Sequence, residues 1–199
     1  MKITKILIAL LAVAFVIATA LVISACNAEL SEEISELWEF DDMVVRAETG
    51  DDTIGGASTR LLDKEEGRVV NINLAVEKIN GIVLQPGEEF SFNDTVGERS
   101  AARGFKEATA LFGTEKIRAV GGGVCQVSTT IYQAVKNAGL EIEERHQHKK
   151  KIPYAEEGQD ATVDFAADFD LRFKNNLDRP IKMHVSTDYE YVHVTIDKL

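Results

Sequence analysis

The chain has 199 residues and a formal net charge of −11, from 22 lysines and arginines against 33 aspartates and glutamates. This length is sufficient for one domain with a hydrophobic core. Because nucleic acids carry a dense negative charge of their own, so acidic a chain argues against nucleic acid as a partner.

Residues 1–25 have the features of a lipoprotein signal peptide. Lys2 and Lys5 give a basic start, and residues 6–22 are almost wholly apolar. The Ile-Ser-Ala-Cys segment that follows matches the lipobox, which predicts lipidation of Cys26 as the new N-terminus. The apolar run is long for a cleaved signal, so an uncleaved membrane anchor is the alternative. Both interpretations predict an extracytoplasmic, membrane-anchored protein, with the membrane as its partner.

Residues 26–67 look peripheral to the domain. Leu30, Ile34 and Leu37 recur with helical spacing, which predicts a short amphipathic helix. Residues 41–59 are acidic and contain glycine, as is typical of a flexible linker. We therefore place the domain at residues 68–199.

The first part of this domain reads as a helix followed by short strands. A helix is expected from Val69 to Ile79, stopped at Asn80-Gly81. Two extended pieces follow at 82–84 and 89–93, separated by a Pro-Gly turn. Residues 108–112 and 117–120 are expected to pair as a hairpin.

A glycine triplet, Gly121-Gly122-Gly123, precedes the helix around which we expect the domain to be organised. This helix runs from Cys125 to Ala138 and is closed by Gly139. Its apolar stripe should be buried against a sheet, whereas Cys125 lies on a hydroxyl-bearing face and should open onto a groove. A helix N-terminus stabilises a thiolate; the alternative is that Cys125 is a small buried hydrophobe.

The chain then turns to strand-like patterns. Alternation over 141–148 places Ile142, His146 and His148 on one face, and residues 160–165 follow with Ala161, Val163 and Phe165 inward. Residues 181–185 and 191–196 form a closing hairpin. The predicted fold class is α+β, an antiparallel sheet packed against a central helix that starts at the Gly-Gly-Gly-Val-Cys segment.

One cysteine, two histidines and an aspartate make a candidate catalytic constellation. If Cys26 is lipidated, Cys125 has no intramolecular disulfide partner. Cysteine chemistry requires a thiolate, an imidazole that takes and returns a proton, and a carboxylate that orients the imidazole. His146 or His148 would be the base, and Asp160 or Asp164 the orienting group.

Most of residues 68–181 resemble the VanW-like family, the W domain of vancomycin B-type resistance proteins. The Gly-Gly-Gly-Val-Cys-Gln block carries the most specific part of the resemblance. The matching stretches are residues 71–75, 79–81, 86–93, 96–100, 104–105, 121–132, 138–140, 144–148, 158–163 and 173–176. The resemblance implies a cell-envelope module outside the cytoplasm, and it specifies no reaction.

Two functions compete. The first is a hydrolase or acyl-transferase acting on peptidoglycan or another envelope polymer, with Cys125 as nucleophile. Backbone amides at 123–126, or the Gln126 side chain, would stabilise an oxyanion. The residues that we expect to bind substrate are Gly122, Gly123, Gln126, Ser128, Thr129 and Tyr132, with Arg99 and Arg145 for a substrate carboxylate.

The second function is a non-catalytic cell-wall binding or scaffolding module, in which the helix start binds an anion and Cys125 merely packs. A zinc site at His146 and His148 with Cys125 is a third interpretation. It lacks a well-supported third and fourth ligand, so we expect no metal and no cofactor.

Overall fold

The computed structural model describes residues 52–188 and 190–199. The chain divides into two units, Met1–Gly50 and Asp51–Leu199, and the described residues belong to the second. The expected signal peptide, Cys26 and the first amphipathic helix therefore lie outside the described residues. Within the described part, no helix combines the length and apolarity needed to cross a bilayer.

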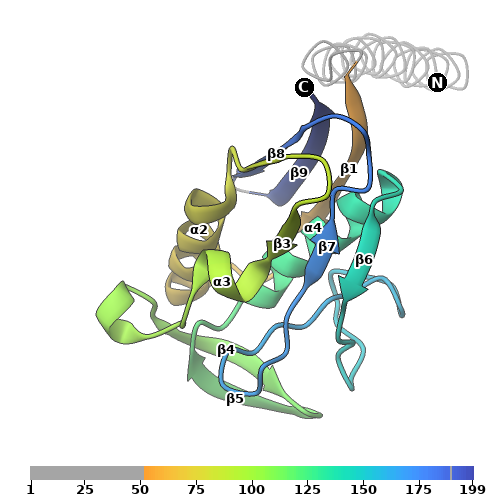
Figure 1. Cartoon of the computed structure of the whole chain (residues 1–199). Coiled ribbons are helices and arrows are strands. Elements are labelled where there is room, and N and C mark those ends of the chain that lie inside the picture. Colours follow the sequence, from red (N-terminus) through yellow and green to blue (C-terminus); the bar gives the residue numbers. More distant parts are fainter. Residues whose placement is uncertain (1–51, 189) are drawn as a thin grey trace, which may run out of the picture. The chain divides into compact units, whose positions relative to one another are not determined.

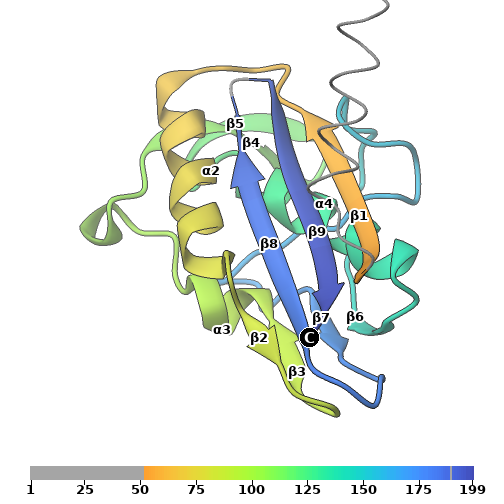
Figure 2. The same cartoon turned by 90° about the horizontal axis from the view of Figure 1, so that it is seen from above.

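A four-stranded antiparallel sheet forms one side of the domain (Figure 2). Its strand order is β1-β9-β8-β2. The strands are β1 (Thr53–Arg60), β9 (Tyr191–Lys198), β8 (Ile181–Thr187) and β2 (Val83–Leu84). The β8–β9 pair confirms the predicted closing hairpin.

The expectation of a flexible linker over 41–59 is wrong for residues 53–59. They belong to β1, which pairs along its length with β9. The glycines that suggested a linker have a packing reason, because a Cβ at Gly55 would lie 2.6 Å from both Ala134 O and Ala138 Cβ. β1 and the central helix thus approach closely only without a side chain at this position.

Two smaller antiparallel sheets complete the strands. One has the order β3-β7-β6, and the other is the β4–β5 hairpin. Their bounds are β3 (Glu89–Ser91), β7 (Arg172–Lys174), β6 (Glu141–Glu144), β4 (Glu107–Phe112) and β5 (Glu115–Val120). The hairpin expected over 108–120 is confirmed, and the strand expected over 141–148 ends at Glu144.

Most of the helices pack against these sheets. The helices are α2 (Glu66–Ile79), α3 (Phe92–Val96), the 3-10 turn η1 (Ala101–Arg103) and α4 (Val124–Asn137). α4 packs on β1 and β9, and α2 packs beside it on β8 (Figures 1 and 2). The β3-β7-β6 sheet lies across the other side of α4 (Figure 1). The α+β class is confirmed.

α4 is buried on both faces, so the prediction that its hydroxyl face borders an open groove is wrong. The apolar stripe is buried as expected, but Ser128 and Thr129 are also 0% exposed. The segment around Ala161 covers them: its carbonyl oxygen accepts hydrogen bonds from Ser128 Oγ at 2.7 Å and Thr129 Oγ1 at 3.2 Å. The polar face of α4, which amphipathicity alone predicted to be exposed to solvent, is therefore covered by another segment of the chain.

Residues 160–165 depart from the expected alternation at one position. Ala161 and Val163 are buried, but the Phe165 side chain is 47% exposed. The segment makes only isolated bridges, His146 with Thr162 and Asp164 with Phe169. Because no continuous ladder fixes the period, the chain turns after Val163 and Phe165 points outward.

Candidate functional site

The glycine triplet forms a tight turn between β5 and α4. Gly121 and Gly123 have φ of +88° and +105°, a region that side-chain-bearing residues rarely adopt. A Cβ at Gly122 would lie 2.6 Å from Ala108 O, so the turn presses against β4. The buried Asn71 clamps it, donating from Nδ2 to Gly122 O and to Lys106 O at 2.9 Å each. The turn thereby sets where α4 begins.

Arginines pack on both sides of this turn. A Cβ at Gly121 would lie 2.7 Å from Arg99 Cβ, and a Cβ at Gly123 would lie 2.7 Å from Arg68 Cγ. Arg99 donates to Asn93 Oδ1 at 2.8 Å, and the charge of Cys125 acts on it. Burial lowers the pKa of Arg99, and the charges of Cys125 and Asp164 oppose that effect. Because these two glycines have no side chain, the Arg99 and Arg68 side chains can pack beside the start of α4.

Cys125 is a free, partly exposed cysteine in the first turn of α4. Its Sγ lies 3.6 Å from Thr162 Oγ1, 3.5 Å from the Val163 N–H that donates to it, and 3.4 Å from Val163 O. The carbonyl can accept from a thiol, whereas the N–H and hydroxyl can donate to a thiolate. Both protonation states of Cys125 therefore have partners here.

His148 and Asp160 complete the site. The His148 Nδ1 lies 2.6 Å from Asp160 Oδ2, which also accepts from the His148 backbone N–H at 2.7 Å. The Asp160 side chain is only 4% exposed, and Arg145 donates to its Oδ1 at 3.2 Å. Because Nδ1 is occupied by the carboxylate, Nε2 is the nitrogen left for the thiol.

The electrostatics favour an ion pair between Cys125 and His148. Burial alone would raise the pKa of the Cys125 thiol, but the neighbouring His148, with the Val163 and Thr162 hydrogen bonds, lowers it. Burial alone would lower the pKa of His148, but Cys125 and Asp160 raise it. A thiol pKa moving down and an imidazole pKa moving up are the conditions for thiolate and imidazolium to coexist.

His146 has side-chain partners other than the thiol. Its Nε2 is 2.7 Å from Glu144 Oε1, and its ring stacks on Phe169 with centroids 4.3 Å apart. The strand alternation that placed His146 and His148 on one face fails because β6 ends at Glu144, after a register shift.

Most of the expected substrate-binding side chains are occupied within the protein. Gln126 is fully buried; its side-chain amide donates to Arg60 O at 2.9 Å and accepts from Arg68 Nη2 at 2.7 Å, so it is not free for an oxyanion. Ser128 and Thr129 bind Ala161 O, while Arg145 holds Asp160 and lies 4.7 Å over the ring of Tyr132. Their placement indicates structural support of the site.

The segment 149–159 borders the site and carries a residue that sequence reasoning missed, Tyr154. Its hydroxyl interacts with Thr129, and the charge of Cys125 acts on it. Burial, with the neighbouring thiolate charge, raises the pKa of Tyr154 well above its ordinary value. No motif pointed to it, since a lone tyrosine in a polar loop carries no chemical signal.

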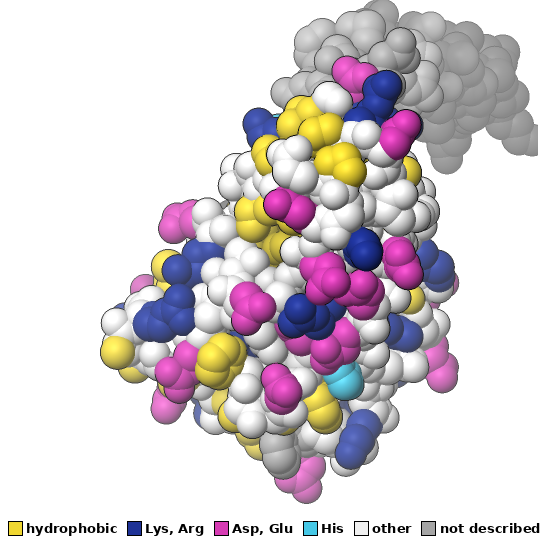
Figure 3. Space-filling view, in the orientation of Figure 1, with side chains coloured by type: hydrophobic (Ala, Val, Ile, Leu, Met, Phe, Trp, Pro, Cys, Tyr) yellow, Lys and Arg dark blue, Asp and Glu magenta, His cyan; other side chains and the backbone are white. Residues whose placement is uncertain are grey.

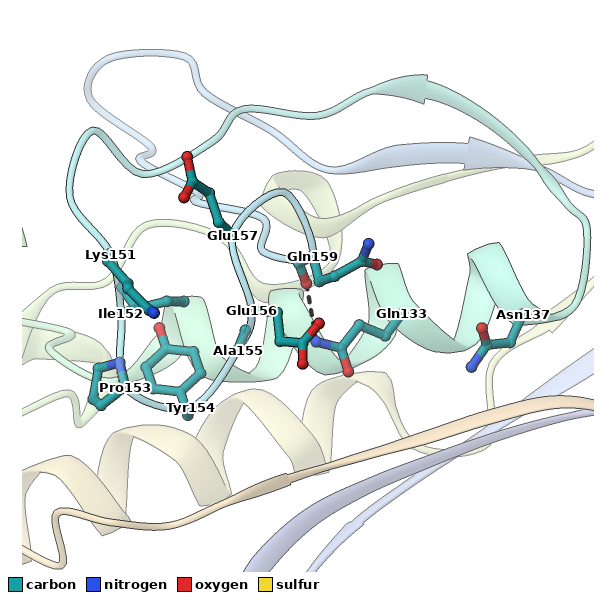
Figure 4. A pocket seen from close by; sticks show the side chains of 10 residues that line it. All are labelled: Gln133, Asn137, Lys151, Ile152, Pro153, Tyr154, Ala155, Glu156, Glu157 and Gln159. Atoms are coloured by element: carbon teal, nitrogen blue, oxygen red, sulfur yellow. Dashed lines mark hydrogen bonds between the residues drawn. The ribbon is translucent and has the colours of Figure 1, made fainter.

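A groove of about 780 Å³ runs along α4 from Tyr154 to Asn137 (Figure 4). Residues 151–157 form one wall, and Gln133 donates across it to Gln159 O at 2.9 Å. A smaller pocket of about 140 Å³ reaches His148 and Asp160. Cys125 lines neither of these two pockets. Acidic side chains gather on the face of the domain seen in Figure 3.

Among the described residues, no group of three or more His, Cys, Asp or Glu side chains is arranged to hold a metal ion. His146 is bound to Glu144 instead of facing Cys125. The geometry therefore gives no support to a zinc site built on the two histidines.

The sequence of this domain matches a known family. The family model described as "VanW like protein" matches residues 67–197, and the chain belongs to this family. It is 40% identical over 128 residues to the uncharacterized protein YoaR of Bacillus subtilis strain 168, covering 64% of this chain and 42% of that protein.

A second relative is the vancomycin B-type resistance protein VanW of Enterococcus faecalis strain V583. The identity is 29% over 161 residues, which cover 78% of this chain and 55% of that protein. The chain thus spans about half the length of these curated relatives. No solved structure matches the chain.

Proposed function

We propose that the domain is a cysteine hydrolase or acyl-transferase acting on peptidoglycan or another cell-envelope polymer. The observation that carries this proposal is the group of three side chains in which Asp160 binds His148 Nδ1 at 2.6 Å and the charge of His148 acts on the Cys125 thiol at the start of α4. A nucleophile, a base and an orienting carboxylate in this order are the parts that acyl transfer needs.

The reaction follows from these positions. The Cys125 thiolate attacks an amide or ester carbonyl, forming a carbon–sulfur bond and a tetrahedral oxyanion. As the intermediate collapses, the carbon–nitrogen or carbon–oxygen bond breaks and imidazolium Nε2 gives its proton to the leaving group. Water or an acceptor amine then loses a proton to Nε2 and attacks the thioester, which restores the thiolate.

The start of α4 offers a donor for the oxyanion. In the described structure Gly121 O accepts from the Val124 N–H and Gly123 O from the Gln126 N–H, which leaves the Cys125 N–H without a backbone acceptor. The first N–H groups of a helix commonly lack intrahelical partners and favour negative charge. We assign the oxyanion to this N–H, with Arg99 supplying positive charge nearby.

The choice of an envelope polymer rests on the signal pattern of residues 1–25. Lipidation at Cys26 would hold the domain outside the cytoplasm at the membrane surface. Peptide cross-links and stem peptides in the envelope contain the amide bonds that a cysteine nucleophile attacks.

Incubation with peptidoglycan fragments tests the proposal. The wild-type protein should release an amine or transfer an acyl group, as followed by mass spectrometry of the fragments. Cys125→Ala and His148→Ala should abolish the product, whereas His146→Ala should retain it. A folded wild-type protein that yields no Cys125-dependent product across envelope polymers would overturn the proposal.

The groove along α4 favours a second candidate, a non-catalytic module that binds envelope polymers. Cys125 does not line this groove. Such a module would sediment with insoluble cell wall and keep doing so in Cys125→Ala. Substitution of Gln133 and Asn137 together would release it, and retention despite this change would contradict the candidate.

A further inference from the structure

Arg68 is a buried cation whose charge has no acidic partner. The residue is 9% exposed, and its Nε is fully buried without a hydrogen-bond partner. Its Nη2 donates at 2.7 Å to Gln126 Oε1, a neutral acceptor. Within the described residues, no carboxylate lies within ion-pair distance of it.

Several other arginines in the domain have acidic partners. Arg118 pairs with Glu65, Arg145 with Asp160 and Arg172 with Glu89. Burying a cation is costly unless it is paired and hydrogen-bonded. In a chain of net charge −11, carboxylates are abundant, so an unpaired buried guanidinium has a cost that folding alone does not explain.

The position of Arg68 links it to the thiol. A Cβ on Gly123 would lie 3.4 Å from Arg68 Nη1, so the guanidinium lies against the turn that begins α4. The Arg68 guanidinium carbon is 5.8 Å from the ring centroid of Tyr154, the residue at one end of the α4 groove. Arg68 therefore lies against the turn two residues before Cys125 and beside Tyr154, one of the residues that line the groove.

We propose that Arg68 anchors a subsite for a carboxylate next to Cys125, so that the substrate is a peptide or acyl compound with a free carboxylate. A guanidinium binds a carboxylate through parallel N–H···O bonds, and the N-terminus of α4 favours the same charge. The inference rests on the proposed function, since it gives a substrate class to the same thiol.

Protection of Cys125 from alkylation tests the subsite without any knowledge of the true substrate. N-acetylglycine carries a free carboxylate, and N-acetylglycinamide is its neutral counterpart. In the wild-type protein, N-acetylglycine should slow alkylation by iodoacetamide in a saturable way, and the amide should not. Inorganic phosphate tests whether any anion suffices.

Variants separate Arg68 from general charge effects. Arg68→Met should raise the half-protecting concentration of N-acetylglycine by about tenfold or more, the loss expected for a charge-assisted contact. Arg68→Lys should lose less, because the charge remains, and it serves if Arg68→Met fails to fold. Arg118→Met removes an exposed charge that pairs with Glu65 and should behave as wild type.

The outcomes are distinct from those of the proposed function. The alkylation rate without ligand reports on the reactivity of the Cys125 thiol and does not depend on the binding of a carboxylate. If that rate is high while N-acetylglycine protects no better than its amide, or protects Arg68→Met and Arg68→Lys as well as wild type, the subsite is refuted. Equal protection by phosphate would refute the carboxylate assignment.

Discussion

Replacing His148 by alanine should slow alkylation of Cys125 and move its pH dependence upward. In the wild-type protein the imidazolium and its hydrogen bond hold the pKa of the thiol below its ordinary value. In His148→Ala the weaker Val163 and Thr162 contacts and the charge of Arg99 remain, but the largest opposing effect, burial, raises the pKa of the thiol. The thiolate population at acidic pH should therefore fall.

The size of the effect follows from two opposing factors. A thiol of pKa about 8.5 is only about 0.3% ionised at pH 6. Each unit by which the pKa falls raises the thiolate fraction about tenfold, while the less basic thiolate loses about threefold in nucleophilicity. Since the gain in thiolate levels off once the thiol is mostly ionised, alkylation at pH 6 should be several-fold to about tenfold faster in wild type than in His148→Ala.

The assay is the rate of iodoacetamide labelling at Cys125 between pH 5 and 9, read by intact mass. The matched control is His146→Ala, since His146 pairs with Glu144 and stacks on Phe169. It should leave the profile unchanged. Equal profiles for wild type and His148→Ala, or an equal shift in His146→Ala, would refute the assignment of His148 as the partner of the thiol.

Three further predictions address the support of the site and the anchor. Asp160→Asn should move the alkylation profile toward higher pH and lower the free energy of unfolding by about 1–3 kcal/mol, because His148 and Arg145 lose a buried acceptor; an unchanged profile would contradict this. Gly123→Ala should lower the melting temperature more than Gly158→Ala. Both variants place alanine at a positive φ, at a cost of about 1–2 kcal/mol. Only the new methyl group at position 123 would also clash with Arg68. Cys26→Ala should block signal removal and lipidation, and an intact Met1 in mass spectrometry of the native wild-type protein would sink the lipoprotein interpretation.

Several elements of the fold could be predicted from local sequence patterns. The helical spacing before Asn80 and the apolar stripe beginning at Val127 predicted α2 and α4, and the glycine triplet predicted where α4 begins. These features depend on neighbours in sequence, so periodicity and turn chemistry detect them. β1 was missed because its glycines serve close packing against α4, a reason that only the tertiary structure reveals.

The residue types of the candidate site could be predicted from the sequence, but their positions relative to one another could not. The cysteine, the histidine pair and Asp160 stand out by residue type, whereas the choice of His148 depends on where β6 ends. Arg68 and Tyr154 gave no local signal, because each acquires its position from long-range packing against Gly123 and Thr129. Residue chemistry can be read along a chain, but distances between segments cannot.

Trapping the covalent intermediate tests the central claim most directly. The protein is mixed with peptidoglycan fragments and quenched in acid within seconds, and its mass is measured by intact-protein mass spectrometry. The Cys125→Ala and His148→Ala variants are treated in parallel. We predict an added acyl mass on wild type that is located at Cys125, removed by hydroxylamine and absent from both variants. A wild-type protein that labels rapidly with iodoacetamide at pH 6, yet acquires no acyl mass from any envelope fragment, would contradict the account.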